Sequence, residues 1–209
     1  MEDTHNFRGQ VQPLNDFPLS LLAVHGAFLL WGTIDSPLPS LYNACVNHTG
    51  RIIQVNISRG GVPKLPVGQA RVFFDRLEGD DWNDRKHHGL SGQAVCLFSV
   101  ELIAELKTEG YPLFPGALGE NLTTEGIDYR RVRLGDRFRV GTEVEIRITK
   151  IRQPCRTITV YGNGIIRATF DAEVKAGNTS SFKWGRSGYY AEVLKEGIAR
   201  PGDTIELLS

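Results

Sequence analysis

The run EVEIRIT, residues 143–149, decides the fold class of this chain. Its β-branched residues alternate with charged or polar residues at a period of two, which is typical of a strand with one buried face. The chain just past such a strand is a loop, and loops are where a scaffold can hold a reactive group in a cleft. We therefore start from this strand and from the loop that follows it.

The loop carries Cys155, which follows Pro154 and lies between Arg152 and Arg156. A thiol acts as a nucleophile or a metal ligand only as its thiolate, and nearby cations favour the thiolate by lowering the thiol pKa. The alternative is structural, because a free cysteine is among the most buried residue types and packs as a small hydrophobe. Cys155 is the candidate reactive residue, with this structural role as the alternative.

Other segments show the same preference for short strands. Residues 52–57 are rich in β-branched residues, and residues 94–98 are wholly apolar, as a strand buried on both faces would be. The turns at 133–138 and 200–205 each place Gly-Asp before a strand-like run, where Gly permits the tight backbone and Asp caps it. Short strands punctuated by Gly favour a barrel or curled sheet over a parallel βαβ array.

One helix is predicted with clear boundaries. Ser99 is a suitable N-cap, Leu102, Ile103 and Leu106 recur at helical spacing, and Gly110 ends the pattern. The apolar stripe is expected to contact the core. The predicted fold class is therefore mainly β with a few helices (α+β), built as a β-barrel.

The composition excludes several classes of function. The chain of 209 residues has 24 Lys and Arg against 24 Asp and Glu, so it has no overall basic field for nucleic acid or an acidic membrane. Cys45, Cys96 and Cys155 are too few and too scattered for a disulfide framework, which indicates a reducing, cytoplasmic compartment. No C-x-x-C pair occurs, so the usual zinc and iron–sulfur sites are not expected, although His87 and His88 are alternative zinc partners for Cys155.

Residues 1–48 are predicted to be a poorly ordered extension of a main domain at 49–209. Residues 17–34 contain no Asp, Glu, Lys or Arg, and their length is at the lower limit for a membrane-spanning helix. Pro18 and two glycines interrupt them, so we expect a weak anchor at most. The alternative is a misassigned translation start, with Val46 as a misread alternative start codon.

Two glycine-rich loops carry candidate binding residues. The segment SRGGVPK at 58–64 could bind a phosphate through glycine amides together with Arg59 and Lys64. The segment DRKHHG at 84–89 places His88 before a glycine, which allows a close backbone approach to a ligand. An isolated loop histidine is otherwise simply solvated, so both interpretations of His88 stay open.

The third loop is PGALGENL at 115–122. It ends in Glu120 and Asn121, and an amide can both donate and accept hydrogen bonds, as recognition of a heterocycle requires. The alternative is that these two side chains cap and tie the loop.

The order and spacing of these segments resemble the MOSC domain, the C-terminal domain of molybdenum cofactor sulfurases. The likeness spans residues 51–208 and implies a bacterial stand-alone protein with a β-barrel-rich fold that binds the molybdenum cofactor. Two positions depart from the family pattern, because Leu90 replaces a usual glycine and Gln93 an arginine. The segments that carry the likeness are 55–64, His88-Gly89, 115–122, Pro154-Cys155 and 188–194.

The resemblance also implies roles for individual residues. Cys155 matches the functional cysteine of the family, as molybdenum ligand or sulfur carrier, and a soft thiolate suits both roles. Cations around Cys155 would favour binding of the negatively charged phosphate of the pterin. The implied cofactor-binding residues are Arg59, Lys64, His88, Glu120, Asn121, Arg152 and Arg156.

Three functions stay open at this point. The first is a cofactor-handling protein in which Cys155 holds molybdenum or a transferable persulfide. The second is a molybdenum-dependent reductase of N-hydroxylated compounds, which would need a separate reductase because the chain lacks a flavin motif and an iron–sulfur cysteine set. The third is a noncatalytic interaction domain, for which Leu90 and Gln93 are the hints. The expected partners are the molybdopterin ligand and a reductase or sulfur-donor protein, with pyridoxal phosphate as a minor alternative cofactor.

Overall fold

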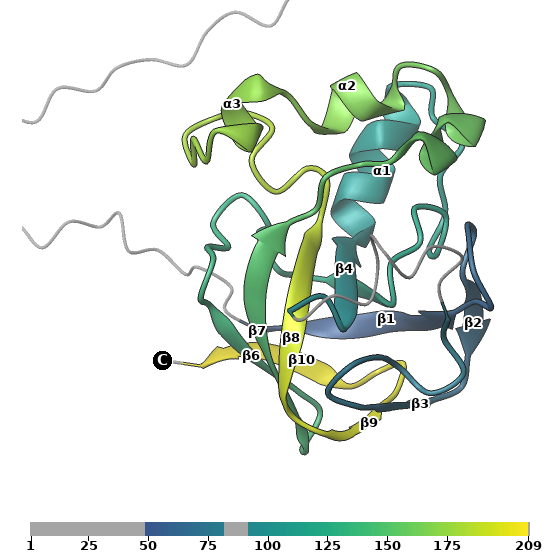
Figure 1. Cartoon of the computed structure of the whole chain (residues 1–209), viewed down its shortest axis with the longest axis vertical. Coiled ribbons are helices and arrows are strands. Elements are labelled where there is room, and N and C mark those ends of the chain that lie inside the picture. Colours follow the sequence, from purple (N-terminus) through teal and green to yellow (C-terminus); the bar gives the residue numbers. More distant parts are fainter. Residues whose placement is uncertain (1–48, 82–91, 209) are drawn as a thin grey trace, which may run out of the picture. The chain divides into compact units, whose positions relative to one another are not determined.

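The computed structural model of this chain describes residues 49–81 and 92–208 (Figure 1). The predictions for residues 1–48, His87, His88 and Leu90 lie outside the described residues. The strands are β1 (Thr49–Ile57), β2 (Leu65–Val67), β3 (Ala70–Val72), β4 (Val95–Ser99), β5 (Leu122–Glu125), β6 (Arg137–Val140), β7 (Val144–Ile151), β8 (Tyr189–Lys195), β9 (Gly197–Ala199) and β10 (Thr204–Leu208). The helices are α1 (Val100–Thr108), the 3₁₀ helix η2 (Arg156–Tyr161), α2 (Ile165–Thr169) and α3 (Ala172–Lys175).

The large sheet closes on itself to form a barrel. Each strand pairs with the next in the order β1, β5, β4, β8, β7, β6 and β10, and β10 pairs back with β1. Within this ring of described strands, β4 and β5 form the single parallel pair, and α1 makes the crossover between them. β2 lies outside the ring on β1, and β3 pairs with β9. The predicted mainly β barrel is confirmed.

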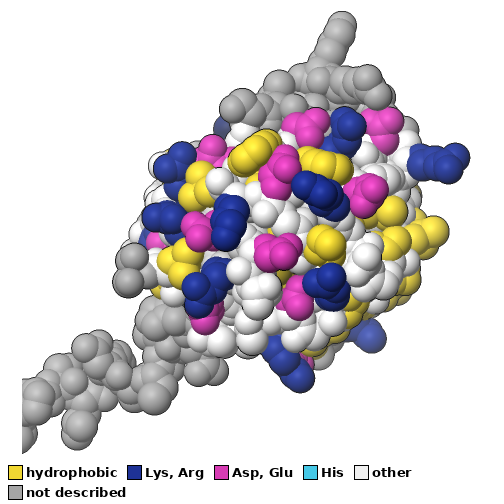
Figure 2. Space-filling model, turned by 90° about the horizontal axis from the view of Figure 1, so that it is seen from below, with side chains coloured by type: hydrophobic (Ala, Val, Ile, Leu, Met, Phe, Trp, Pro, Cys, Tyr) yellow, Lys and Arg dark blue, Asp and Glu magenta, His cyan; other side chains and the backbone are white. Residues whose placement is uncertain are grey.

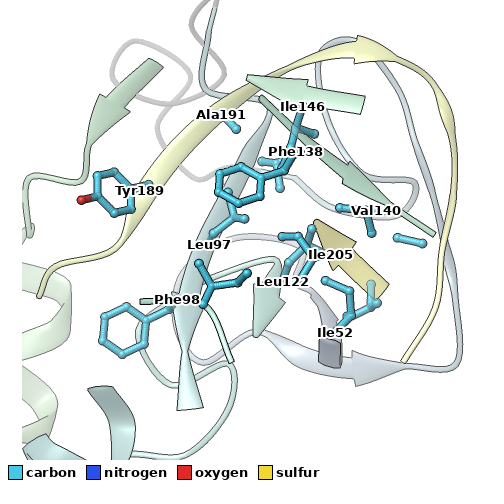
Figure 3. Close-up of a cluster of buried hydrophobic side chains, with 14 of the residues drawn as sticks. Ile52, Leu97, Phe98, Leu122, Phe138, Val140, Ile146, Tyr189, Ala191 and Ile205 are labelled. Atoms are coloured by element: carbon cyan, nitrogen blue, oxygen red, sulfur yellow. The ribbon is translucent and has the colours of Figure 1, made fainter. Parts of the chain in front are cut away.

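The strand pattern that opened the sequence analysis is confirmed in β7. Val144, Ile146 and Ile148 are buried, whereas Arg147 is exposed. Figure 3 shows Ile146 among inward-pointing side chains from several strands, including Leu122, Phe138 and Ile205. One cavity among the apolar side chains described here is about 10 Å³, too small for a ligand. The described side chains inside the ring thus form a packed core.

β4 is buried on both faces, as its sequence predicts. Leu97 points into the barrel, whereas Phe98 points away from it (Figure 3). The strand passes directly into α1, where the hydroxyl of Ser99 accepts a hydrogen bond from the Leu102 backbone N–H at 3.1 Å. Leu102, Ile103 and Leu106 are buried, so both the predicted cap and the predicted core-facing stripe are confirmed.

The two Gly-Asp turns form as predicted. The carboxylate of Asp136 accepts a hydrogen bond from the Arg133 backbone N–H at 2.7 Å, and Asp203 does the same for Arg200 at 2.8 Å. Gly202 adopts φ of +91°, a conformation that side-chain-bearing residues rarely take. These turns lead into β6 and β10, which are neighbours in the barrel.

The helical segments after Cys155 were not predicted. η2, α2 and α3 are only 6, 5 and 4 residues long, too short to show helical periodicity in the sequence. They lie along one end of the domain, close to α1 and opposite the end formed by β3 and β9 (Figure 1). We refer to residues 156–175 as the cap.

The outer surface of the barrel mixes charges of both signs. Figure 2 shows Lys and Arg side chains interspersed with Asp and Glu on the face seen from below. Cross-strand pairs account for much of this mixing, such as Arg137 with Glu145 at 2.9 Å and Arg147 with Glu192 at 2.6 Å. Among the described residues, no helix has the length and apolar character needed to cross a membrane.

Two glycines with the same backbone conformation allow a test of how tightly β8 packs against β4. Gly188 has φ of +81° and Gly177 has φ of +82°, but a Cβ on Gly188 would lie 2.4 Å from the Leu97 carbonyl oxygen, whereas one on Gly177 would meet nothing within 4 Å. We expect Gly177→Ala to lower the free energy of unfolding by about 1 to 2 kcal/mol through backbone strain alone. Gly188→Ala should cost about 3 kcal/mol or more, because the clash adds to that strain.

Urea denaturation of both variants measures the difference. Equal losses would contradict the close approach of Gly188 to β4.

Candidate functional site

Cys155 lies at the junction of β7 and the cap, as the residue immediately before η2. Its side chain is half-buried. Burial alone would raise the pKa of the thiol, but hydrogen bonds from the Thr157 hydroxyl and from the backbone of Thr157, the positive charge of Arg152 and a backbone hydrogen bond from Ile158 outweigh it, so the pKa lies below its ordinary value. The fold therefore favours the thiolate at this position.

Arg152 is the cation that acts on this thiol. Its backbone N–H donates to the Gly188 carbonyl at 2.9 Å, which extends the β7–β8 ladder, and its guanidinium donates to the Leu118 carbonyl. The guanidinium is also hydrogen-bonded to the Tyr190 hydroxyl, and burial raises the pKa of Tyr190 to about 12. Arg152 is only 6% exposed, whereas Arg156 is exposed on η2. Of the two flanking arginines, Arg152 is built into the site.

Glu120 lies fully buried beside this arginine. Its Oε1 atom accepts hydrogen bonds from the Gly116 backbone N–H at 2.6 Å and from the Thr123 hydroxyl at 3.0 Å. In the described part of the chain its Oε2 atom has no hydrogen-bond partner. Burial raises the pKa of the Glu120 carboxyl, although the Gly116 hydrogen bond and the charge of Arg152 act in the opposite direction. Glu120 is thus a buried carboxyl with one of its two oxygens unpartnered among the described residues.

Asn121 uses its amide to connect separate segments. Its Oδ1 atom accepts from the Cys96 backbone N–H at 3.1 Å, and its Nδ2 atom donates to Asp80 at 2.8 Å and to the Asn56 carbonyl at 3.3 Å. These contacts match the loop-tying interpretation of the sequence. A direct role of Asn121 in cofactor binding stays a prediction.

Lys64 forms a buried ion pair with Asp80. The same carboxylate accepts from the Ser58 backbone N–H at 2.8 Å and from Asn121, so it is fully hydrogen-bonded despite its burial. The positive charge of Lys64 is thus balanced within the protein. The contact of Lys64 with a phosphate stays a prediction. In the described contacts, Lys64 holds the 58–64 loop in place through Asp80.

Arg59 is exposed in the turn after β1. His88 lies outside the described residues.

Cys96 on β4 is a second, buried thiol near these residues. Burial raises its pKa, and four charged groups are close enough to influence it electrostatically. These four are Arg152, Lys64, Glu120 and Asp80.

Sequence reasoning missed Asp80, Cys96 and Tyr190 as members of this assembly. Asp80 stands in a polar loop whose other charges gave no reason to single it out. Cys96 and Tyr190 sit opposite each other on β4 and β8, a register that only the sheet pairing reveals. The one available signal was that Tyr190 lies two residues after Gly188, within a segment that matched the family pattern.

The two described cysteines should differ sharply in their reaction with iodoacetamide as the pH changes. Because the pKa of Cys155 is lowered, its alkylation rate should begin to fall at a lower pH than the alkylation rate of an ordinary thiol does. Cys96 should stay unmodified in the folded protein, because it is buried and its pKa is raised. Peptide mapping by mass spectrometry after timed alkylation measures both rates.

Thr157→Val should move the Cys155 profile toward higher pH, since it removes the hydroxyl donor but keeps the side-chain shape. An unchanged profile would contradict the role of that hydroxyl.

The buried ion pair should carry more stability than a surface pair. Lys64→Met leaves Asp80 as an uncompensated buried charge, so we expect a loss of about 3 to 5 kcal/mol in the free energy of unfolding. Arg51→Met removes an exposed pair with Glu125 and should cost less than about 1 kcal/mol.

Urea unfolding of the two variants gives the comparison. Similar small losses would show that Asp80 is satisfied by its other donors alone.

Comparisons with known proteins show the family of the chain. The profile of the MOSC domain matches residues 84–206, which is more than half of the chain. The protein YflK of Bacillus subtilis (strain 168) is 32% identical over 153 residues, which cover 71% of this chain and 63% of YflK. A protein named "Reductase" from Gibberella moniliformis (strain M3125 / FGSC 7600) is 29% identical over 135 residues, covering 58% of this chain and 20% of that protein.

A solved structure shares the fold. The crystal structure of YiiM from Geobacillus stearothermophilus superposes with a TM-score of 0.55 at 24% identity, covering 77% of this chain and 75% of that chain. The aligned part spans less than two thirds of both YflK and the Gibberella protein, at 63% and 20% of their lengths. From the family profile, and with a barrel fold that agrees, the chain belongs to the MOSC domain family.

Proposed function

We propose that this protein binds the molybdenum cofactor and uses Cys155 as a molybdenum ligand or as a carrier of sulfur. The observation that carries the proposal is the half-buried Cys155 thiol, whose pKa is lowered beside the buried Arg152. Membership of the MOSC family supports it, since the family is associated with this cofactor in general.

The residues around Cys155 fit such a ligand chemically. A soft thiolate suits molybdenum, and a guanidinium suits the negative charge of a pterin phosphate. Within the described residues no group of three His, Cys, Asp or Glu side chains gathers as a metal site, so Cys155 is proposed as the protein's contribution.

When bound, the cofactor would supply two-electron redox chemistry at its metal. The chain itself would hold the thiolate in place through Thr157 and the start of η2, and Arg152 would balance the added negative charge. Tyr190 and the Leu118 carbonyl would fix the guanidinium that does so. The Lys64–Asp80 pair and Asn121 would keep the surrounding loops in register.

Sulfur carriage is the second form of the same proposal. The Cys155 thiolate would attack the outer sulfur of a donor persulfide, a new sulfur–sulfur bond would form, and the donor would leave as its thiol. This exchange needs a persulfide-bearing partner protein and no added oxidant.

A molybdenum-dependent reductase of N-hydroxylated compounds is the second candidate function. The observation that favours it is the relative named "Reductase". Such an enzyme would require a separate electron donor, because the chain has no flavin motif and no iron–sulfur cysteine set.

The loading of molybdenum tests the role of Cys155 directly. The full chain, purified from a host that makes the molybdenum cofactor, should carry molybdenum and pterin, and Cys155→Ala should lower the molybdenum content at least about tenfold, since loss of even a supporting residue costs this much. Cys96→Ala, which removes the other described thiol, should retain the metal. Elemental analysis and pterin fluorescence give both quantities, and equal molybdenum in wild type and Cys155→Ala would defeat the ligand role.

The same preparations separate the carrier from the enzyme. Cyanide should release thiocyanate from wild type and not from Cys155→Ala if the residue carries sulfur. With a reductase system and an N-hydroxylated base, turnover that depends on Cys155 would identify the reductase. A fully loaded protein without turnover would favour the carrier.

A further inference from the structure

Asn163 and Gly164 form the turn that joins η2 to α2 in the cap. They are the single Asn-Gly pair in the sequence. The side chain of Asn163 is exposed, and the Ile165 backbone N–H closes the turn by donating to the Gly162 carbonyl at 3.2 Å. Because glycine has no side chain, nothing on residue 164 itself shields its backbone nitrogen from the amide of Asn163.

Hydrogen bonding leaves both of these groups free. Within residues 49–81 and 92–208, the side-chain amide of Asn163 makes no hydrogen bond, and the Gly164 backbone N–H donates to no acceptor. The Gly164 carbonyl, in contrast, accepts from the Ala168 backbone N–H at 3.0 Å. Gly164 is therefore held at the start of α2 through its carbonyl, while its nitrogen stays available.

The packing of the turn requires the glycine at position 164. A Cβ on Gly164 would lie 2.6 Å from the Tyr111 hydroxyl oxygen, and one on Gly162 would lie 3.1 Å from the ring of the same tyrosine. The backbone N–H of Tyr111 donates to the Leu106 carbonyl at 3.1 Å, which ties this tyrosine to the end of α1. The contact with Tyr111 thus keeps an unshielded nitrogen next to Asn163.

The other asparagines that the structure describes lack this combination. Asn178 is also exposed, but the branched side chain of Thr179 crowds the backbone nitrogen that follows it, and its Oδ1 atom accepts a backbone hydrogen bond at 3.0 Å. Asn56 and Asn121 are buried, and their amides are hydrogen-bonded. Asn163 is the asparagine with an exposed, unbonded amide beside a glycine.

We propose that Asn163 is a site of spontaneous deamidation. The Gly164 nitrogen attacks Cγ of Asn163, a new carbon–nitrogen bond forms, and the bond from Cγ to Nδ2 breaks. Ammonia leaves with the proton that the Gly164 nitrogen loses. Water then opens the resulting succinimide ring at one of its two carbonyl carbons, which gives aspartate or isoaspartate. The reaction needs no oxidant, reductant or enzyme, and the proposal is independent of the proposed function.

The isoaspartate product changes the main chain of the cap. It inserts one CH₂ group into the backbone between η2 and α2, whereas both products add one negative charge. η2 and α2 pack against each other, and their connection lies directly on Tyr111. A longer main chain cannot keep this fit, so isoaspartate at position 163 loosens the cap. The cap lies at one end of the domain (Figure 1), and the barrel keeps its own packed core.

Timed incubation of the full chain in mildly alkaline buffer tests the reaction. Peptide mapping by mass spectrometry should show the acid at position 163 accumulating at least about tenfold faster than at Asn178, because glycine leaves the attacking nitrogen unshielded. Electron-transfer fragmentation distinguishes isoaspartate from aspartate, and both should be present. Asn163→Gln should block the reaction, since its longer side chain disfavours ring closure. An intact amide at position 163 after incubation, or equal rates at Asn163 and Asn178, would overturn the proposal.

Limited trypsin digestion measures the loosening of the cap. Cleavage after Arg167, which is exposed on α2, should be faster in incubated wild type than in fresh wild type. Incubated Asn163→Gln should be cleaved there as slowly as fresh wild type. Cleavage after Arg131, exposed in a turn before β6, is the matched control and should not change in any sample.

Asn163→Asp separates the charge from the change in the main chain. This variant adds the negative charge without the extra CH₂ group, so trypsin should cleave it after Arg167 at the rate of fresh wild type. Cleavage as fast as in the incubated protein would contradict the main-chain effect. Circular dichroism melting should give the same midpoint for Asn163→Asp and Asn163→Gln as for wild type, because residue 163 is exposed.

Discussion

The pairing of β10 with β1 is the constraint on which the rest of the structure depends. It joins the last strand to the first described strand, from Thr49 opposite Glu206 to Arg51 opposite Thr204, and closes the sheet into a ring. A closed ring has no free edges, and its inward residues fill one common core. The described side chains inside the ring pack together, and the candidate site residues lie on the outer face of the barrel and in the loops that cover it.

The candidate site occupies such a covered part of the outer face. Cys96 and Tyr190 point outward from β4 and β8, and the loops that bear Glu120, Lys64 and Arg152 lie over them. Nearly every polar group there has a protein partner, which fixes the loops relative to the strands. The exceptions with buried, unpartnered atoms in the described chain are Glu120, Arg186 and Ser187. Rigid surroundings of this kind suit a site that must hold one thiol in one orientation.

Much of the fold could be predicted, because it rests on short-range patterns. The alternation in 143–149, the apolar run before Ser99 and the Gly-Asp turns each express a local rule that the barrel obeys. The candidate site was harder to predict, since its residues come from separate strands and loops. Lys64 illustrates the limit, because its sequence context suggested a phosphate ligand, whereas its buried partner Asp80 becomes visible only when the two loops meet. The helices of the cap were missed because each is too short to have a period.

Arg152 has a consequence that reaches beyond the site. Its backbone is the last rung of the β7–β8 ladder, while its side chain reaches the Leu118 carbonyl, Tyr190 and the neighbourhood of Cys155. One residue therefore belongs both to the framework and to the chemistry. Selection acting on this position cannot improve one property independently of the other. Related proteins that change their ligand are accordingly expected to adjust the exposed positions around Arg152 before they replace it.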